Sequence, residues 1–238
     1  MAYSGEENKI GGITGTLRAI LLFAITTIAY ALGILPLLIL AHVFLQWIDI
    51  GNPLGLVLLS IFIVAEYLVL LFSMIFSTAF FINVFKLKYS DGTYRKTLND
   101  KMAFKFVTYF ALYYPTYKLI NIFVLPQLKS FYLSLIGCKI GKNVFLAGEE
   151  WIDPCMVEIG ENTMIGGRAM ILGHIAEENL LLRRTKIGKN CLIGGGSFIM
   201  PGVVIEDNVV VGAKAMVPKD MVLKSGKTYV GIPAKPIK

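Results

Sequence analysis

The sequence predicts a chain of two unlike parts: an apolar helical hairpin, followed by a parallel β-helix built from six-residue repeats. Two observations lead to this prediction. No Asp, Glu, Lys or Arg lies between Arg18 and Asp49, and Glu66 is the single such residue between Asp49 and Lys86. In the C-terminal third, branched aliphatic residues instead recur every six positions. A short amphipathic segment joins the two parts.

The first part, residues 1–86, is predicted to be a transmembrane helical hairpin. Residues 17–47 and 54–85 each exceed the ~20 apolar residues that a bilayer-spanning helix needs. The apolar run is too long for a signal peptide, and no small-residue cleavage site follows it. The turn between the spans has no basic residue, whereas residues 86–142 contain ten Lys or Arg and two acids. The positive-inside rule therefore predicts a two-span plasma-membrane protein with both termini in the cytoplasm.

Glu66 lies near the middle of the second predicted span, where a charged group is costly. Two interpretations stay open. Glu66 marks a functional site in the membrane, or its protonated carboxyl satisfies a backbone carbonyl that Pro36 frees on the facing helix. A path for acceptor or product through the membrane part is one form of the first interpretation.

Charge and cysteine content exclude several classes of protein. The basic residues after the hairpin suit anionic lipid headgroups, and no nucleic-acid motif accompanies them, so membrane lipids rather than nucleic acid are the predicted partner. Cys138, Cys155 and Cys191 are widely spaced and form no CxxC pair. They suit a reducing compartment and predict no metal site.

Residues 87–136 are predicted to form amphipathic juxtamembrane helices. After a polar stretch with an Asp-Gly turn signal, aromatic residues and lysines follow a helical pattern over 101–135, and Pro115 and Pro126 are expected to break it. Such helices commonly lie among the lipid headgroups, with their lysines reaching toward water. The alternative is a packing layer beneath the next domain, and the two arrangements are compatible.

Residues 137–238 are predicted to form the β-helix. A helix would repeat at 3.6 residues and a simple strand at 2, so a period of six indicates stacked hexapeptide coils. The aliphatic residue of each hexapeptide points inward, as does a small residue two positions before it, and Gly, Asn or Asp occupy the turns. The aliphatic positions are Ile140, Leu146 and Ile152, then, one residue out of phase, Ile159, Ile165 and Ile171, and finally Ile187, Ile193, Ile199, Ile205, Val211, Val217 and Leu223. The small positions are Cys191, Ser197, Val203, Val209 and Ala215.

The blocks KIGKNCLIGGGSFIMPGVVIEDNVVVGAKAMVPKDM and GIPAKPIK resemble the hexapeptide-repeat acyltransferases, which include galactoside, maltose and xenobiotic acetyltransferases. The resemblance covers residues 136–238. The whole layout is also similar to the membrane-embedded C-terminal units of amino-acid homopolymer synthetases such as poly-lysine synthetase. The resemblance implies a left-handed coil, which is an exception to the right-handed crossover rule. It also implies a homotrimer with active sites between subunits. The implied co-substrate is an acyl-CoA, with acetyl-CoA as the first candidate.

The repeat is interrupted between Ile171 and Ile187, where His174 begins a charged loop. Transfer of an acyl group to an amine or hydroxyl needs a general base, and histidine suits this near neutral pH. His174 falls at the equivalent of the family's catalytic histidine, and the alternative is an ordinary turn histidine. Glu177 matches an acid of the homopolymer-synthetase segment and is expected to orient the ring or position the acceptor. Its alternative is a solvated loop residue.

Three further acids are expected to bind the acceptor, and they are Glu150, Asp153 and Glu178. Asp153 aligns with an acceptor-contacting acid of the sugar acetyltransferases. Acids beside a base suit a cationic amine as well as sugar hydroxyls. The loop is shorter than in many sugar acetyltransferases, so the resemblance does not imply a sugar.

The positions that match the family's cofactor contacts are Gly195, Ser197, Ala213, Lys214, Lys219 and Lys235. The lysines would meet CoA phosphates as point charges, or they belong to ordinary solvated surface. The predicted function is a membrane-anchored acyltransferase acting on a small-molecule or membrane-associated acceptor. A non-catalytic trimeric scaffold or binding module is the alternative. A zinc carbonic anhydrase on the same fold is disfavoured, because it needs three histidine ligands and the chain has two histidines.

Overall fold

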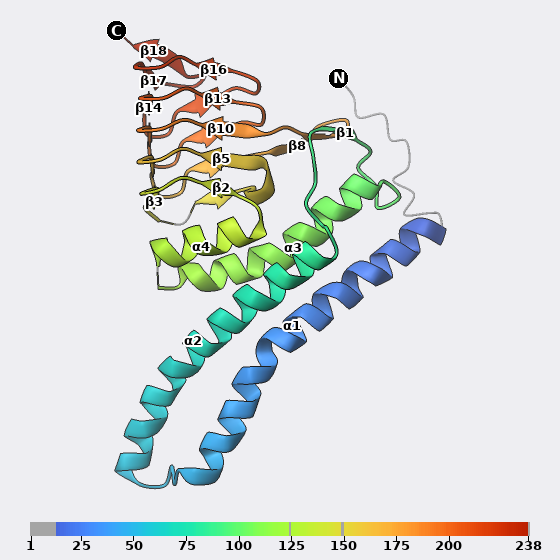
Figure 1. The fold of residues 1–238 in the computed structure, drawn as a ribbon, viewed down its shortest axis with the longest axis vertical. Coiled ribbons are helices and arrows are strands. Elements are labelled where there is room, and N and C mark those ends of the chain that lie inside the picture. Colours follow the sequence, from blue (N-terminus) through green and yellow to red (C-terminus); the bar gives the residue numbers. More distant parts are fainter. Residues whose placement is uncertain (1–12, 124, 149, 238) are drawn as a thin grey trace.

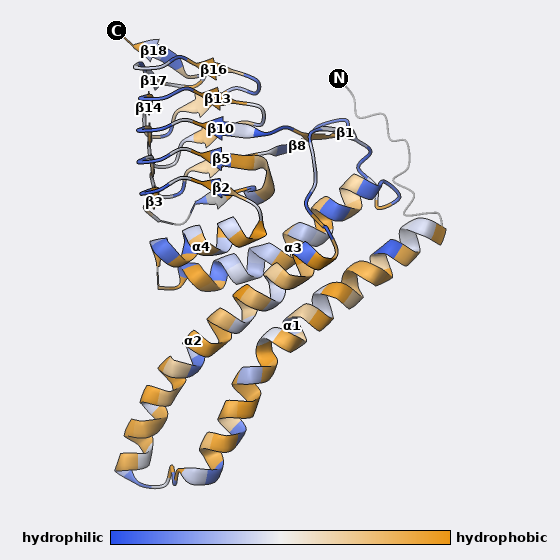
Figure 2. Ribbon diagram, viewed as in Figure 1, coloured by the Kyte–Doolittle hydropathy of each residue, from blue (hydrophilic) through white to orange (hydrophobic). Residues whose placement is uncertain are grey.

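The computed structural model describes residues 13–123, 125–148 and 150–237, which form a helical hairpin, a helical layer and a solenoid (Figure 1). The helices α1 (Ile13–Trp47) and α2 (Pro53–Val84) make the hairpin, and both are long and apolar enough to cross a membrane. Hydrophobic residues cover both helices along their length, and many are exposed (Figure 2). The two predicted spans coincide with these helices apart from a few residues at their ends.

Small residues and a capped turn bring the two helices together. The side chain of Asn52 accepts a hydrogen bond from the backbone N–H of Gly55 at 2.9 Å, which starts α2. A Cβ atom on Gly33 would lie 2.4 Å from Sδ of Met74, so glycine permits the close approach of α1 and α2. The Ser77 hydroxyl then donates to the Ala29 carbonyl at 2.6 Å.

Glu66 lies in α2, as predicted, but its carboxyl group does not form the predicted hydrogen bond to a carbonyl of α1. Helix α1 continues through Pro36. Among the residues that the structure describes, neither carboxyl oxygen of Glu66 has a hydrogen-bond partner, although the residue is only 8% exposed. The interpretation in which Glu66 satisfies a carbonyl freed by Pro36 is therefore wrong.

The helical layer consists of α3 (Lys101–Asn121) and α4 (Pro126–Ile136). Pro126 begins α4 as predicted, but the expectation that Pro115 breaks the preceding helix is wrong, because α3 runs through it. A proline has no N–H, so the carbonyl of Ala111 loses its helical donor. The hydroxyl of Tyr30 on α1 donates to that carbonyl instead. A contact from the hairpin thus compensates for the proline.

Replacing Tyr30 with phenylalanine is expected to lower the free energy of unfolding by about 1 kcal/mol, because the Ala111 carbonyl loses its donor. Thermal unfolding in detergent measures this cost. In a Pro115→Ala background the helix supplies its own N–H, so the same Tyr30→Phe change should cost clearly less. Equal costs in the two backgrounds would contradict the compensation.

The helical layer packs beneath the solenoid, as the alternative interpretation of this segment expects. Tyr109 and Tyr113 are buried, and their hydroxyls donate to the carbonyls of Ile136 at 3.0 Å and Ile152 at 2.8 Å. Lys129 does not reach toward water as predicted. Its side chain is fully buried and pairs with Glu150 at 2.9 Å.

The solenoid has three parallel sheets, and the chain visits them in turn (Figure 1). The first sheet contains β2 (Lys139–Ile140), β5 (Val157–Ile159), β10 (Thr185–Ile187), β13 (Val204–Ile205) and β16 (Val222–Leu223). The second contains β3 (Phe145–Leu146), β6 (Met164–Ile165), β11 (Leu192–Ile193), β14 (Val210–Val211), β17 (Thr228–Val230) and the antiparallel β18 (Lys235–Ile237). The third contains β4 (Trp151–Ile152), β7 (Met170–Ile171), β12 (Phe198–Ile199) and β15 (Met216–Val217).

The inward positions of the hexapeptides are confirmed. The aliphatic series from Ile159 onward and the small residues two positions before them are buried, and Ile140 at the first coil is half-buried. Asparagines occupy successive turns between the first and second sheets with positive φ, and they are Asn143, Asn162, Asn190 and Asn208. Asparagine tolerates this conformation better than most residues.

Two departures from the six-residue period lie on the same edge of the solenoid, between its third and first sheets. The first is the one-residue shift between Ile152 and Ile159, which the short helix η1 (Pro154–Met156) absorbs. The second is the antiparallel hairpin of β8 (His174–Ala176) and β9 (Leu180–Leu182). Because Ile152 pairs with Ile171, the two departures occur on neighbouring coils.

The hairpin of β8 and β9 gains a third strand from outside the solenoid. Strand β1 (Gly92–Tyr94), which lies between α2 and α3, pairs antiparallel with β9. The sequence did not predict this strand. Its three residues lie in a polar segment that shows no apolar alternation.

Candidate active site

The edge with the two departures brings a histidine and an aspartate together. Asp153 follows β4 and His174 begins β8, and the distance from Nδ1 of His174 to Oδ2 of Asp153 is 2.6 Å. The backbone N–H of Gly173 donates to the same oxygen at 2.7 Å. The Asp153 side chain is 1% exposed, whereas that of His174 is 22% exposed. The pair therefore has a buried acid and a partly accessible ring.

Packing fixes the position of the imidazole. The ring of Phe106 on α3 lies against it, with 4.7 Å between the ring centroids. Gly173 sits so close to η1 that a Cβ atom there would lie 2.2 Å from Cβ of Met156. A larger residue at position 173 would displace the backbone that carries His174. The helical layer and the solenoid thus both hold the ring.

The environment of His174 sets its acid–base behaviour. Burial alone lowers the pKa of the imidazole, but the hydrogen bond and the negative charge of Asp153 outweigh burial and raise the pKa above its usual value. In the neutral ring, Nδ1–H donates to the carboxylate, which leaves the Nε2 lone pair as the proton acceptor. This arrangement is the one that a general base requires.

Replacing Asp153 with asparagine is expected to lower kcat/KM for the acyl transfer expected from the sequence by about 10²- to 10⁴-fold, because the imidazolium loses its charged partner. With His174 as the expected base, the rate falls when the ring becomes protonated, so the acidic limb of the pH–rate profile follows the His174 pKa. Loss of the Asp153 charge lowers that pKa, and the acidic limb should move to lower pH. A pH–rate profile measures both effects, with Glu161→Gln as a control that removes an exposed acid elsewhere on the solenoid. An unmoved limb would contradict the coupling.

Glu177 does not orient His174 in the structure. Its carboxylate pairs with Nζ of Lys219, at 2.7 Å from both oxygens. Glu177 lies beyond β8, in the exposed turn that also holds Glu178. The acid that contacts the His174 ring is therefore Asp153 and not the expected Glu177. Sequence reasoning instead predicts Asp153 as an acceptor-binding acid.

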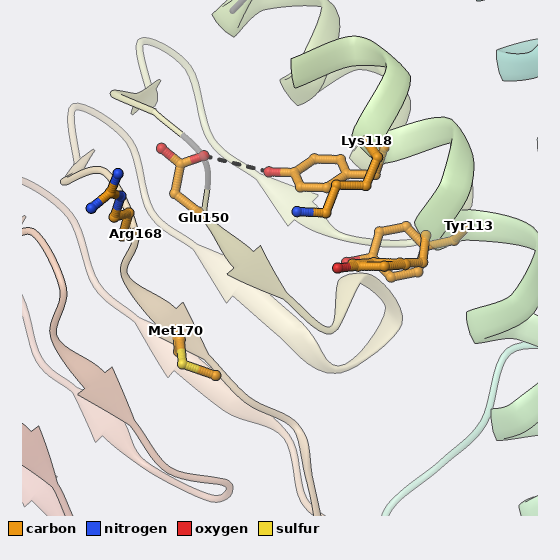
Figure 3. A pocket seen from close by; sticks show the side chains of 7 residues that line it. Tyr113, Lys118, Glu150, Arg168 and Met170 are labelled. Carbon is orange, nitrogen blue, oxygen red and sulfur yellow. Dashed lines mark hydrogen bonds between the residues drawn. The ribbon is translucent and has the colours of Figure 1, made fainter. Parts of the chain in front are cut away.

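A cavity of about 210 Å³ lies between α3 and the solenoid, and Glu150 lines it. Its other lining residues are Tyr113, Tyr114, Tyr117, Lys118, Arg168 and Met170. Figure 3 shows Tyr113 and Lys118 on the helix side, with Glu150, Arg168 and Met170 on the solenoid side. A row of aromatic rings on α3, formed by Phe106, Phe110 and Tyr114, connects the cavity with His174.

Glu150 does not offer a free carboxylate to an acceptor. Oε2 meets Nζ of Lys129 at 2.9 Å, and Oε1 accepts the backbone N–H of Gly148 at 2.5 Å. Tyr117 adds a longer hydrogen bond of 3.4 Å. The cationic groups of Lys118 and Arg168, which the sequence did not single out, line the same cavity.

The predicted cofactor positions divide between two edges of the solenoid. Gly195, Ala213 and Lys214 lie in turns between the second and third sheets, where Lys214 N–H donates to the Gly195 carbonyl at 3.0 Å. Lys219 lies in a turn between the third and first sheets, on the edge that carries His174. Lys235 is exposed at the start of β18.

The Ser197 side chain does not reach the surface, so the predicted cofactor contact at this position would involve its backbone alone, and it stays a prediction. Its side chain is fully buried inside the solenoid, and among the described residues its hydroxyl has no hydrogen-bond partner. Its backbone N–H and carbonyl bond to Gly194 and Met170. The residue fills the small inward position of its hexapeptide and does not reach the surface.

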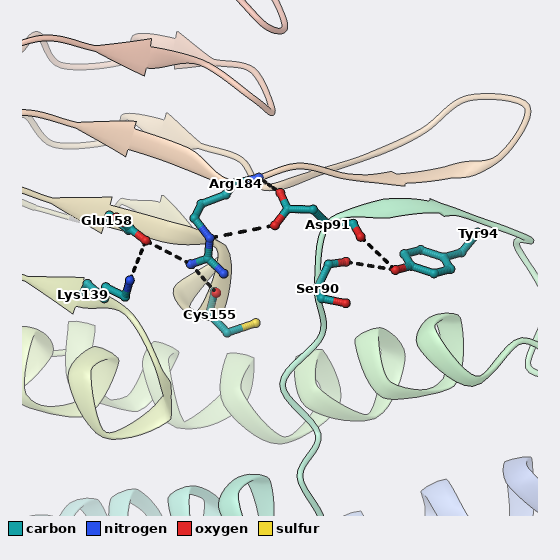
Figure 4. A network of polar contacts seen from close by, with 7 residues as sticks. All are labelled: Ser90, Asp91, Tyr94, Lys139, Cys155, Glu158 and Arg184. Carbon is teal, nitrogen blue, oxygen red and sulfur yellow. Dashed lines mark hydrogen bonds and ion pairs between the residues drawn. The ribbon is translucent and has the colours of Figure 1, made fainter.

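Arg184 anchors the base of the β8–β9 hairpin to the segment before β1 and to the coil of η1 and β5 (Figure 4). Its backbone N–H donates to Asp91 beside β1 at 2.6 Å, and its guanidinium reaches the Cys155 carbonyl at 3.3 Å and Glu158 at 3.4 Å. The pKa of Glu158 is lowered, first by its hydrogen bond from Lys139 and then by the charges of Lys139 and Arg184. These contacts hold the hairpin against the coil that carries Asp153.

The three-sheet solenoid and its six-residue period define the chain as a hexapeptide-repeat protein. Residues 184–219 match the family described as bacterial transferase hexapeptide (six repeats), and residues 156–178 match the hexapeptide repeat of succinyl-transferase. These matches, together with the relatives described next, support the hexapeptide-repeat acyltransferase superfamily for this chain.

Two known proteins show the extent of the similarity. The chain is 31% identical over 102 residues to the Delta-poly-L-ornithine synthetase of Acinetobacter baumannii (strain AB307-0294), an alignment that covers 42% of this chain and 8% of that protein. The crystal structure of a maltose O-acetyltransferase from Clostridium difficile 630 matches with a TM-score of 0.50 and 25% identity, covering 64% of this chain and 94% of the other. The chain thus spans a small part of the synthetase and nearly the whole of the acetyltransferase.

Proposed function

We propose that this chain is a membrane-anchored acyltransferase that moves an acyl group from acyl-CoA to an amine or hydroxyl acceptor. Acetyl-CoA is the first candidate for the donor. The observation that carries the proposal is the His174–Asp153 pair, set at the interrupted edge of an acyltransferase solenoid. The acceptor is a small molecule or a membrane-associated one, and the reaction takes place at the cytoplasmic face of the plasma membrane.

In the proposed reaction, Nε2 of His174 takes the proton of the acceptor as its nitrogen or oxygen attacks the thioester carbonyl carbon. The bond from that carbon to the thioester sulfur breaks, and the protonated ring gives its proton to the departing thiolate. Asp153 keeps the ring in the required tautomer and stabilises the imidazolium between these two steps. The packing of Phe106 against the ring and of Gly173 against η1 holds the imidazole in position for both proton transfers.

We further propose that the coil is left-handed and that the protein acts as a homotrimer. In each chain the third sheet separates the edge with His174 from the edge with Gly195 and Lys214. Two groups on opposite edges of one sheet do not meet within one chain. In the proposed trimer, the edge with His174 from one copy and the edge with Gly195 and Lys214 from its neighbour meet at one acyl-CoA. This arrangement matches the active sites between subunits that the family resemblance implies.

The hairpin is the proposed membrane anchor, with two spans and both termini in the cytoplasm. Support comes from the exposed apolar side chains of α1 and α2 and from the basic residues that follow them. Lipids then surround the hairpin, and the helical layer holds the solenoid close to the bilayer surface.

Calorimetry with acetyl-CoA tests the proposal on the full chain in nanodiscs. We expect saturable binding with one site per chain. Mass spectrometry of a panel of amines, amino acids and sugars, incubated with the protein and acetyl-CoA, should then identify the acetylated acceptor. No binding of acetyl-CoA would favour the non-catalytic scaffold instead.

A further inference from the structure

Glu66 is a buried carboxyl group without a partner, far from the proposed active site. Among the residues that the structure describes, neither Oε1 nor Oε2 has a hydrogen-bond partner, and the residue is 8% exposed. It lies on α2 within the hairpin, whereas His174 lies against α3. Acids without partners are rare at this depth in a bilayer, and those that occur commonly serve a function.

A cavity of about 410 Å³ between α1 and α2 has Glu66 in its wall. Its size falls in the range of small-molecule sites, roughly 300–1,000 Å³. Apart from Glu66 and Tyr67, its lining is apolar, with Leu37 and Ala41 from α1 and Leu70 from α2 among its residues. The rings of Phe44 and Phe62 stack at 3.9 Å across the two helices and form part of its wall.

The other polar group in the lining does not serve Glu66. The Tyr67 hydroxyl donates to the carbonyl of Leu119 at 2.5 Å, which directs it to the helical layer. Among the described residues of this wall, the carboxyl of Glu66 is therefore the one unsatisfied polar group, and the rest of the lining is mainly hydrocarbon. A ligand that complements the Glu66 carboxyl and the apolar lining has one cationic donor group and an aliphatic body.

We propose that the cavity binds an aliphatic primary amine, with its ammonium group at Glu66 and its alkyl chain along the groove between α1 and α2. The ammonium supplies the hydrogen-bond donors that both carboxyl oxygens lack among the described residues. The chain covers apolar side chains that the two helices leave uncovered. A fatty acid would place a second carboxyl group beside Glu66, and an alcohol would offer one O–H donor where the ammonium offers three N–H donors. The site is separate from the proposed acyl-transfer site.

The test uses the full chain in phosphatidylcholine nanodiscs, which have no anionic headgroups to attract the amine. The probe is dodecylamine with a photoreactive diazirine on its alkyl chain, and mass spectrometry locates the labelled peptides. We expect labelling of residues 37–45 and 59–70. Glu66→Gln should reduce it at least tenfold. Leu70→Trp, which fills the cavity but keeps the carboxyl, should reduce it similarly.

Matched controls separate recognition from partition into the lipid. Leu56→Trp changes an exposed residue of α2 that does not line the cavity, so labelling should stay unchanged. The dodecanol analogue of the probe should label these peptides at least tenfold less than the amine. Each variant must also elute at the wild-type volume and keep its acetyl-CoA binding, which verifies folding independently of the site. Equal labelling of wild type and Glu66→Gln, equal labelling by the alcohol, or no labelling of wild type would each overturn the proposal.

Discussion

Replacing His174 with alanine is expected to lower kcat of acyl transfer by about 10²- to 10⁴-fold, because the acceptor then loses its proton to water alone. The ring contributes little to the fold. It is partly accessible, and its charged partner, Asp153, keeps the backbone N–H of Gly173 as a donor. The size-exclusion profile and acetyl-CoA affinity should therefore stay near the wild-type values. Rates of CoA release measured with a thiol reagent give kcat directly.

The matched control for this prediction is His42→Ala. His42 is the chain's other histidine, lies on α1 and contacts Gln46 at 2.9 Å. Its replacement should leave kcat unchanged. If His174→Ala kept more than a tenth of the wild-type rate with the acceptor saturating, His174 would not be the base.

Replacing Lys129 with methionine is expected to destabilise the fold by about 3–5 kcal/mol, because it leaves the Glu150 carboxylate buried without its cation. Both side chains of this pair are fully buried, at the junction between α4 and the solenoid. Lys129 also donates to the carbonyl of Gly148, so the change removes a second hydrogen bond. Chemical denaturation followed by tyrosine fluorescence measures the loss.

Two further variants show whether the charge is responsible for this loss. Adding Glu150→Gln to Lys129→Met removes the uncompensated charge and should recover most of the stability. Lys139→Met breaks a pair in which Lys139 is 70% exposed, and it should cost less than about 1 kcal/mol. A loss that persists in the double variant would show that packing, and not the buried charge, dominates.

Local patterns were sufficient to predict the hairpin, the six-residue period and the departure of the chain at His174. Charge-free apolar stretches and a fixed period are properties of consecutive residues, so they can be read without knowing contacts. The start of α4 at Pro126 and the asparagine turns follow for the same reason. The continuation of α3 through Pro115 could not be predicted, because its compensation comes from Tyr30, 85 positions earlier in the sequence.

The partner of His174 shows what else sequence reasoning missed. Glu177 is near in sequence, but the antiparallel hairpin carries it to Lys219. Asp153 is 21 positions away, yet the pairing of Ile152 with Ile171 places it one coil below. The one-residue shift after Ile152 was a visible signal at this coil. The burial of Lys129 was not predicted, because it is decided by the neighbouring helix and coil and not by residue type.

Strand β1 has a practical consequence for work on this protein. A fragment that starts at residue 137 would contain every repeat, yet it would leave Leu180–Leu182 as an unpaired strand edge beside His174. It would also lack the Asp91 contact to Arg184 and the Phe106 ring. Truncations meant to keep the surroundings of His174 ordered should therefore begin upstream of Ser90, so that β1 and α3 are retained.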